Sequence, residues 1–390
     1  MYRKTFALLV ACAAVVGVAA VVSSGDAGGV DATTAEFSAG ITSGSTPSAI
    51  AAGADGNTWF VEPRWNDHDL SAPGQVAKIT PAGVITEYGT GIGAHQRAND
   101  IVAGPDGNMW FVELSVDIPN EYRGIGRITP SGAIMEFALT RFTPRSIAAG
   151  SDGNLWFTVS PEYNQPASIS RITPAGVVTD FSDGLQPNAS PFQIVTGRDG
   201  NLWFLDFPDT IGRIDASGKI REFPLGPDAQ NAAGITAASD GNVWITANDA
   251  AGSSRVVRVK PDGTLTAFAA GITPGRFAAA ITEGPDGSLW FVEATLQEGT
   301  VGLGRITPDG AITEFPSPVG PNSGETAIAT GCDGNLWLTE PEIDRVVRFT
   351  PPASNATRTL PVACKASVKS TPSTTTTTKP KKKPKAKTKK

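Results

Sequence analysis

A short phrase with the core Asp-Gly-Asn-x-Trp-Phe recurs seven times along the chain, and this repetition constrains the fold more than any other feature. Successive copies begin 51, 46, 47, 41, 46 and 47 residues apart. Each copy carries one tryptophan: Trp59, Trp110, Trp156, Trp203, Trp244, Trp290 and Trp337. A period of this length that holds several short strands is typical of a β-propeller, in which each repeat forms one blade. The sequence therefore predicts an all-β, seven-bladed β-propeller.

The second repeat shows how one blade is built. Four short apolar runs, at 100–103, 108–112, 126–129 and 134–137, are separated by Asp-Gly and Pro-containing turns and predict four antiparallel strands. The tryptophan and the residue after it must point to opposite faces of the second strand, so both should pack between blades. We therefore interpret the tryptophans as core rather than an aromatic cage. The Asp-Gly-Asn phrase is interpreted as a turn rather than a calcium site, because it lacks a dense acidic loop.

Closure of the ring needs a strand borrowed from the opposite end of the chain. The segment 33–37 resembles the fourth strand of a repeat but precedes the first strand of the first repeat. We predict that it pairs with the third strand of the last blade, 345–350, and so removes the exposed edge. The segment 356–360 is a competing fourth strand. Cys332 and Cys364 are predicted to form a disulfide, with two buried or unpaired thiols as the alternative.

The two ends of the chain differ from its body. Residues 1–28 combine Arg3 and Lys4 with an apolar run at 6–22, which predicts a signal peptide cleaved near Ala20 or Ala27, or else an uncleaved membrane anchor. The propeller is expected over 31–364. The Thr- and Lys-rich segment 365–390 should be disordered because it cannot bury apolar surface. The chain is therefore expected to be secreted or held at the cell surface.

Charge is divided between the body and the tail. Residues 31–364 contain 20 Lys and Arg against 37 Asp and Glu, a net charge of −17, whereas the segment after Cys364 carries ten Lys and no acid. An acidic body argues against nucleic acid as its ligand. The basic tail either stays solvated or contacts an anionic cell-wall polymer or lipid headgroups. We expect a monomer.

One face of the propeller should carry the ligand site. The connections between blades and the loops between second and third strands share this face, here called the mouth, and those loops vary in length. Five carboxylates end a second strand, three residues after its tryptophan: Glu62, Glu113, Asp206, Glu293 and Glu340. They either accept backbone N–H bonds at the strand ends or form an acidic ring at the mouth that binds a cationic ligand or a divalent cation. No cofactor is required by the sequence; Mg²⁺ and Ca²⁺ are the candidates.

The phrases at 104–111 and 304–315 resemble those of the virginiamycin B lyase, or streptogramin lyase, family, and the resemblance covers residues 34 to about 350. It implies a seven-bladed propeller that opens a cyclic depsipeptide antibiotic by elimination at its ester linkage, using Mg²⁺. Such chemistry needs a base for an α-proton, a group that stabilises the enolate and a proton donor to the leaving oxygen.

The resemblance places the working histidines two residues before the isoleucine of the first strand in the last two blades. Here those positions are Ala279 and Thr326, and the other blades carry Ser48, Asn99, Arg145, Phe192 and Ala233. The family's catalytic glutamate falls near Pro341, between Glu340 and Glu342. The chain has two histidines, His68 and His95, both in connections predicted at the mouth.

The sequence supports two functions. The first is an exported, non-catalytic propeller that binds a small molecule, glycan or protein at a mouth that includes Asn99, Asp100, Arg145 and Thr326. The second is a C–O lyase of the streptogramin type, or a metal-dependent lactonase or hydrolase. His95, Glu340 and Glu342 are the catalytic candidates for this second function.

Overall fold

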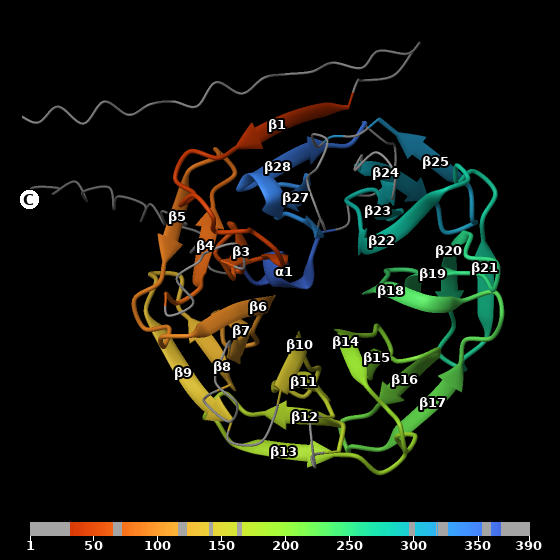
Figure 1. Cartoon of the computed structure of the whole chain (residues 1–390), viewed down its shortest axis with the longest axis horizontal. Coiled ribbons are helices and arrows are strands. Elements are labelled where there is room, and N and C mark those ends of the chain that lie inside the picture. The colour runs from red at the N-terminus through yellow and green to blue at the C-terminus, as the bar shows by residue number, and fades with distance from the viewer. Residues whose placement is uncertain are drawn as a thin grey trace, which may run out of the picture.

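A ring of seven four-stranded antiparallel sheets surrounds a central axis in the computed structural model (Figure 1). The structure describes residues 32–64, 72–115, 123–139, 143–161, 166–295, 301–316, 318, 327–352 and 360–367. The predicted seven-bladed, all-β propeller is confirmed. In each blade the first strand lies at the axis and the fourth at the periphery (Figure 1).

The strand bounds follow the repeats. Blades 1 to 3 consist of β2 (Ile50–Ala52), β3 (Thr58–Glu62), β4 (Gln75–Ile79) and β5 (Ile85–Tyr88); β6 (Gln96–Ala103), β7 (Met109–Ser115), β8 (Arg123–Ile128) and β9 (Ile134–Leu139); β10 (Thr143–Ala149), β11 (Leu155–Ser160), β12 (Ser168–Ile172) and β13 (Val178–Phe181). Blades 4 to 6 consist of β14 (Pro191–Thr196), β15 (Leu202–Asp206), β16 (Thr210–Ile214) and β17 (Ile220–Pro224); β18 (Gln230–Ala237), β19 (Val243–Asn248), β20 (Ser254–Val259) and β21 (Leu265–Phe268); β22 (Arg276–Glu283), β23 (Leu289–Thr295), β24 (Val301–Ile306) and β25 (Ile312–Phe315). Blade 7 combines β26 (Ile328–Thr330), β27 (Leu336–Glu340) and β28 (Arg345–Thr350) with β1 (Thr33–Phe37), and a short 3-10 helix, η1 (Pro341–Ile343), joins β27 to β28.

The repeated phrase folds into a self-contained turn between the first and second strands. In blade 2, Asp106 accepts hydrogen bonds from the Asn108 backbone at 3.2 Å, the Asn108 side chain at 2.7 Å and the Trp110 indole at 3.0 Å. Gly107 supplies the positive φ, +79°, that the turn requires. In blade 6, Ser288 replaces the asparagine, and Arg305 donates to Asp286 at 2.7 Å instead. These seven turns form the face that we call the turn rim, and their aspartate oxygens already serve protein donors.

Tryptophan and the residue that follows it join each blade to its two neighbours, as predicted. Trp110 packs with Ile147 and Phe157 of blade 3, whereas Phe111 packs with Trp59 of blade 1. The tryptophan side chains of the seven repeats are all buried. A glycine in the third strand makes room for the phenylalanine ring, because a Cβ at Gly126 would lie 2.1 Å from Phe111. The core is thus a set of interfaces between blades, each with large aromatic burial.

The ring closes as the sequence predicts. β1 pairs antiparallel with β28, from Thr33 opposite Thr350 to Phe37 opposite Val346. An ion pair between Arg345 and Glu36 joins the two strands. At the mouth, the Asp344 carboxylate accepts backbone N–H bonds from Gly44 at 2.6 Å and Thr46 at 2.9 Å. The competing segment 356–360 lies, except for Leu360, outside the described residues.

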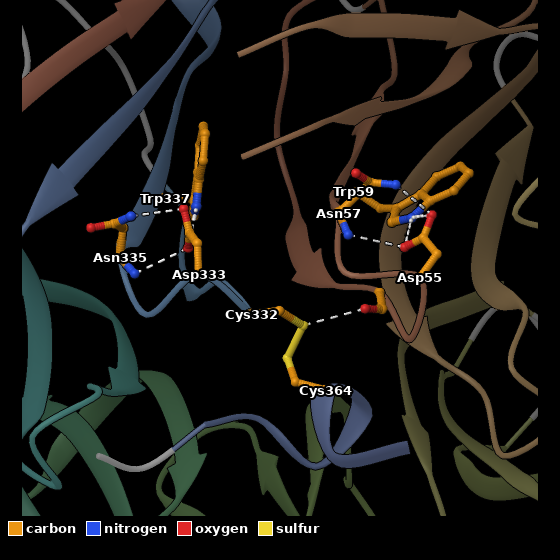
Figure 2. The surroundings of a disulfide bond; sticks show 9 residues. Asp55, Asn57, Trp59, Cys332, Asp333, Asn335, Trp337 and Cys364 are labelled. Atoms are coloured by element: carbon orange, nitrogen blue, oxygen red, sulfur yellow. Dashed lines mark hydrogen bonds between the residues drawn. A yellow bond between two sulfur atoms is a disulfide. The ribbon is translucent and has the colours of Figure 1, made fainter. Parts of the chain in front are cut away.

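The predicted disulfide between Cys332 and Cys364 is also confirmed, with 5.4 Å between the two Cα atoms. It joins the turn after β26 to the short helix α1 (Val362–Ser367), as Figure 2 shows. The Cys332 sulfur also lies 3.4 Å from the carbonyl oxygen of Gly53 in blade 1. The disulfide therefore lies beside the junction between the first and last blades.

The predicted leader and tail fall largely beyond what the structure describes. Residues 1–31 and 368–390 are outside the described ranges, so the signal peptide, the anchor and the disordered tail remain predictions. Among the residues that are described, no helix is both long enough and apolar enough to cross a membrane.

Candidate functional site

A cavity of about 2070 Å³ runs along the propeller axis. The first strands of all seven blades line it, and one isoleucine from each gives its wall an apolar middle: Ile50, Ile101, Ile147, Ile194, Ile235, Ile281 and Ile328. Each isoleucine lies two residues after one of the seven positions compared with the family's histidines. We call these seven the ring positions: Ser48, Asn99, Arg145, Phe192, Ala233, Ala279 and Thr326. The cavity is therefore the space around which the seven repeats place equivalent residues.

One end of the cavity is lined by the segment tethered through the disulfide. Residues 360–363 border the cavity together with turn-rim residues such as Gly104 and Gly150, and α1 lies over the centre of the ring (Figure 1). At this same end Arg198 and Glu283 form an ion pair at 3.3 Å, and Glu283 also accepts the backbone N–H of Ser239. The turn-rim end is thus held together by ion pairing and the disulfide.

The opposite end is the predicted mouth, and its residues differ from blade to blade. Six ring positions line the cavity: Ser48, Asn99, Arg145, Phe192, Ala233 and Ala279. The seventh, Thr326, lies outside the described residues. Of the predicted mouth residues, Asn99, Asp100 and Arg145 do line the cavity. None of the six described ring positions is a histidine.

Asn99 and Asp100 are tied to the neighbouring blade. The Asn99 amide donates to the carbonyl oxygen of Arg145 at 3.3 Å. The Asp100 carboxyl accepts the backbone N–H groups of Ile101 at 2.9 Å and Ile147 at 3.0 Å. Burial raises the pKa of Asp100, although these hydrogen bonds oppose the shift. Both residues therefore hold blades 2 and 3 together at the mouth.

Arg145 has a different environment. Its side chain is exposed and lines the cavity, and its guanidinium makes no hydrogen bond or ion pair with the residues that the structure describes. Arg145 and Phe192 also border a smaller cavity of about 280 Å³, with Ser160, Ser190 and Phe207. The Phe207 ring is 60% exposed. Phe207 lies in the short loop between β15 and β16, where no repeat pattern marks it.

The five carboxyl groups predicted at the mouth do not line the cavity. Glu62, Glu113, Asp206, Glu293 and Glu340 are all buried. Of the two alternatives, acceptance of a backbone N–H at the strand end is seen for Asp206, which accepts that of Ser190 at 2.5 Å. In blades 2 and 6, Glu113 and Glu293 lie opposite glycines of the third strand, Gly124 and Gly302.

Four of these groups pair with another acid. The partners lie in the fourth strand of the same blade: Glu87, Glu136, Glu222 and Glu314. Burial, and then repulsion from Glu87, raises the pKa of Glu62 to about 9, so that Glu62 carries a proton at neutral pH and can donate it to Glu87. Burial likewise raises the pKa of Glu222 and of Glu293 to about 7.

The outer acid of each pair connects its blade to the preceding one. Glu136 accepts the backbone N–H of Gly93 at 2.7 Å, and Glu314 accepts the backbone N–H of Thr273. Both donors lie in the connection that leads into the blade concerned. The glutamate before the aromatic residue of the fourth strand was the signal in the sequence that could have revealed these pairs.

The metal expected from the family does not fit these residues. Within the described ranges no group of three or more His, Cys, Asp and Glu side chains is placed to hold an ion. In four blades the acids lie in pairs, and burial raises the pKa of one acid of each pair. In blade 7, Glu340 instead forms an ion pair with Arg345 at 2.9 Å. We therefore derive no step through Mg²⁺ or Ca²⁺.

The catalytic candidates are dispersed. Glu342 lines the central cavity, whereas Glu340 is buried beside Arg345. His95, in the left-handed conformation with φ of +63°, is absent from the described lining of that cavity. His68 lies outside the described residues. The described part of the mouth thus contains one acid in the family's region and no imidazole beside it.

The fold and its axial cavity define a seven-bladed propeller with a ligand-sized space at its centre. Comparison with protein families gives the same class: the model of the virginiamycin B lyase family matches residues 30–270 and 227–378. The chain belongs to the virginiamycin B lyase family.

Solved structures agree with this assignment. A streptogramin B lyase structure is 25% identical, with a TM-score of 0.65 over 82% of this chain and 97% of that one. A catalytically inactive histidine-to-alanine variant of virginiamycin B lyase from Staphylococcus aureus, with quinupristin, is 28% identical, with a TM-score of 0.66 over 82% and 99% of the two chains. Comparison with curated protein sequences finds no significant match.

Proposed function

We propose that this protein is an exported binding propeller whose mouth holds a small organic ligand without cleaving it. The central observation is the composition of the ring at the mouth. Its described positions supply hydrogen-bonding, cationic and aromatic groups around an apolar cavity, and none supplies the imidazole that elimination needs. Binding requires only shape and a few placed polar groups, whereas elimination also requires a base and a proton donor.

Export is supported by the disulfide, because such bonds persist in oxidising compartments. The apolar segment at 6–22, preceded by Arg3 and Lys4, supports the same proposal from the sequence. The basic tail is proposed to hold the protein near an anionic cell-wall polymer or a membrane surface, and the propeller itself is proposed to be a monomer.

Quinupristin tests whether turnover has been lost. The protein is incubated with quinupristin beside an active streptogramin lyase, and ring opening is followed by reversed-phase chromatography with fragmentation mass spectrometry, because elimination within a ring gives a linear isomer of the same mass. We expect the antibiotic to keep its retention time and cyclic fragmentation pattern with this protein while the lyase converts it to the linear isomer. Ring opening at a rate comparable to that of the lyase would establish the alternative, a C–O lyase, and Glu342→Gln would then show whether the acid at the mouth takes part.

Crystallographic soaking with a library of small fragments tests the location of binding. We expect bound fragments to gather at the mouth, against the first strands and the smaller cavity between blades 3 and 4. Fragments that bind only on the outer strands, or only at the turn rim, would show that the mouth is not the ligand site.

A further inference from the structure

We propose that the mouth between blades 3 and 4 is a subsite for an organic anion, a carboxylate attached to an apolar or aromatic body. This inference rests on the proposed binding function and gives the ligand a chemical class. The subsite is the smaller cavity bordered by Arg145, Phe192 and Phe207, together with Ser160 and Ser190.

The charge of the ligand follows from Arg145. Other described arginines that border an inner cavity or a blade interface have partners: Arg198 pairs with Glu283, and Arg276 pairs with Glu293. Arg145 has no such partner within the described part of the chain, although the body of the protein is strongly acidic. A guanidinium presents planar, paired donors that match a carboxylate, and it keeps its charge at any physiological pH. The group that completes this site is therefore an anion.

Acids near the subsite are already engaged. Both Asp100 oxygens accept backbone N–H groups, one from Ile101 of its own blade and one from Ile147 of blade 3. The Asp206 carboxyl is buried and accepts the backbone N–H of Ser190 at 2.5 Å. Neither acid lines the smaller cavity. Glu342 lines the large cavity but belongs to blade 7, on a different part of the ring.

The apolar part of the ligand follows from the two phenylalanines. Phe192 lines both cavities, and Phe207 exposes 60% of its surface beside it. An exposed aromatic ring next to a cation is a common arrangement at ligand sites, since the ring stacks on an apolar body while the cation binds its charged end. The shared lining lets a ligand held at Arg145 extend over the isoleucines of the central cavity.

Matched probes test the inference. The affinities of 3-phenylpropionate and of its neutral amide, 3-phenylpropionamide, are measured by isothermal titration calorimetry on the full chain. We expect the acid to bind about tenfold more tightly than the amide, because a hydrogen bond to a charged group contributes more than a neutral one. Arg145→Gln should remove this preference. Phe207→Ala should weaken acid and amide alike.

Arg198→Gln is the control, because it removes a cation from the same central cavity at the opposite end. It should leave the preference for the acid intact. Equal affinity for acid and amide, or a preference that survives Arg145→Gln, would overturn the anion subsite and leave the binding function standing. Failure of both probes to bind at millimolar concentration would overturn the subsite, and if soaked fragments also avoid the mouth, the binding function fails with it.

Discussion

The two faces of this propeller are built from the same seven repeats but differ in how strictly the repeats agree. On the turn rim, every blade satisfies a buried indole with the aspartate four residues before it, as in Trp156 with Asp152 at 3.1 Å and Trp337 with Asp333 at 3.2 Å. At the mouth, equivalent positions carry an arginine, a phenylalanine, an asparagine or an alanine. Uniform positions maintain the fold, whereas positions that the fold leaves free to vary can determine what binds.

The largest expected loss of stability comes from a substitution near the turn rim. Trp156→Ala removes a fully buried side chain from the interface between blades 3 and 4, so we expect the free energy of unfolding to fall by about 3–5 kcal/mol. Chemical denaturation measures this loss. Phe207→Ala, an aromatic truncation at the exposed mouth, should change stability by no more than about 0.5 kcal/mol. Equal losses in the two variants would erase the distinction between the faces.

The second-largest expected loss of stability comes from removing the disulfide. Cys332 and Cys364 are 32 residues apart, so replacing both by serine should lower the free energy of unfolding by about 3 kcal/mol, chiefly by releasing the unfolded chain. Denaturation of the wild type with and without a reductant provides an independent measurement. A double variant as stable as the wild type would show that α1 does not reinforce the junction of the first and last blades.

The buried acid pairs predict a dependence on pH. The pKa of Glu62 is raised to about 9 in the folded protein from 4.5, so its contribution to stability is complete below about pH 4.5. That contribution is lost as the pH rises toward 9, because the unfolded state releases the proton that the folded state retains. Glu62→Gln keeps a neutral group beside Glu87 and should flatten the loss between pH 5 and 9. An unchanged profile would contradict the pairing.

Asp106→Asn is a control, because the contribution of Asp106 to stability depends on pH in the opposite direction. Burial raises the pKa of Asp106, but hydrogen bonds from Trp110 and Asn108 outweigh it and lower the pKa below 3.8. Its contribution is therefore present above the unfolded pKa and is lost as the pH falls. The asparagine variant should alter the profile on the acid side and leave the loss above pH 5 as it is in the wild type.

The sequence predicted the parts of the molecule that repeat. Seven copies of one phrase determined the number of blades, and the fourth-strand pattern at 33–37 identified the closing strand, because a periodic signal is strengthened by every copy. The pairing of Cys332 with Cys364 followed from their being the two cysteines of the body. Asn99, Asp100 and Arg145 were located at the mouth by their register with the isoleucines.

The carboxyl groups show where such reasoning stops. Their position at the end of a second strand was correct. Alternation along a strand does not say, however, whether the side chain of an end residue points into the axial cavity or toward the fourth strand of its own blade. A glycine in the third strand leaves the space into which Glu113 turns, since a Cβ at Gly124 would lie 2.8 Å from its carboxylate oxygen. Phe207 was missed because a loop residue has no periodic counterpart in the other blades.

Thermal denaturation with and without 3-phenylpropionate, on the wild type and two variants of blade 3, tests the division between the faces most directly. Asp152→Ala, at the turn rim, should lower the melting temperature and keep the rise that the ligand produces. Arg145→Gln, at the mouth, should keep the melting temperature of the wild type and lose that rise. The reverse pattern, with Asp152→Ala abolishing the rise and Arg145→Gln destabilising the fold, would contradict the account.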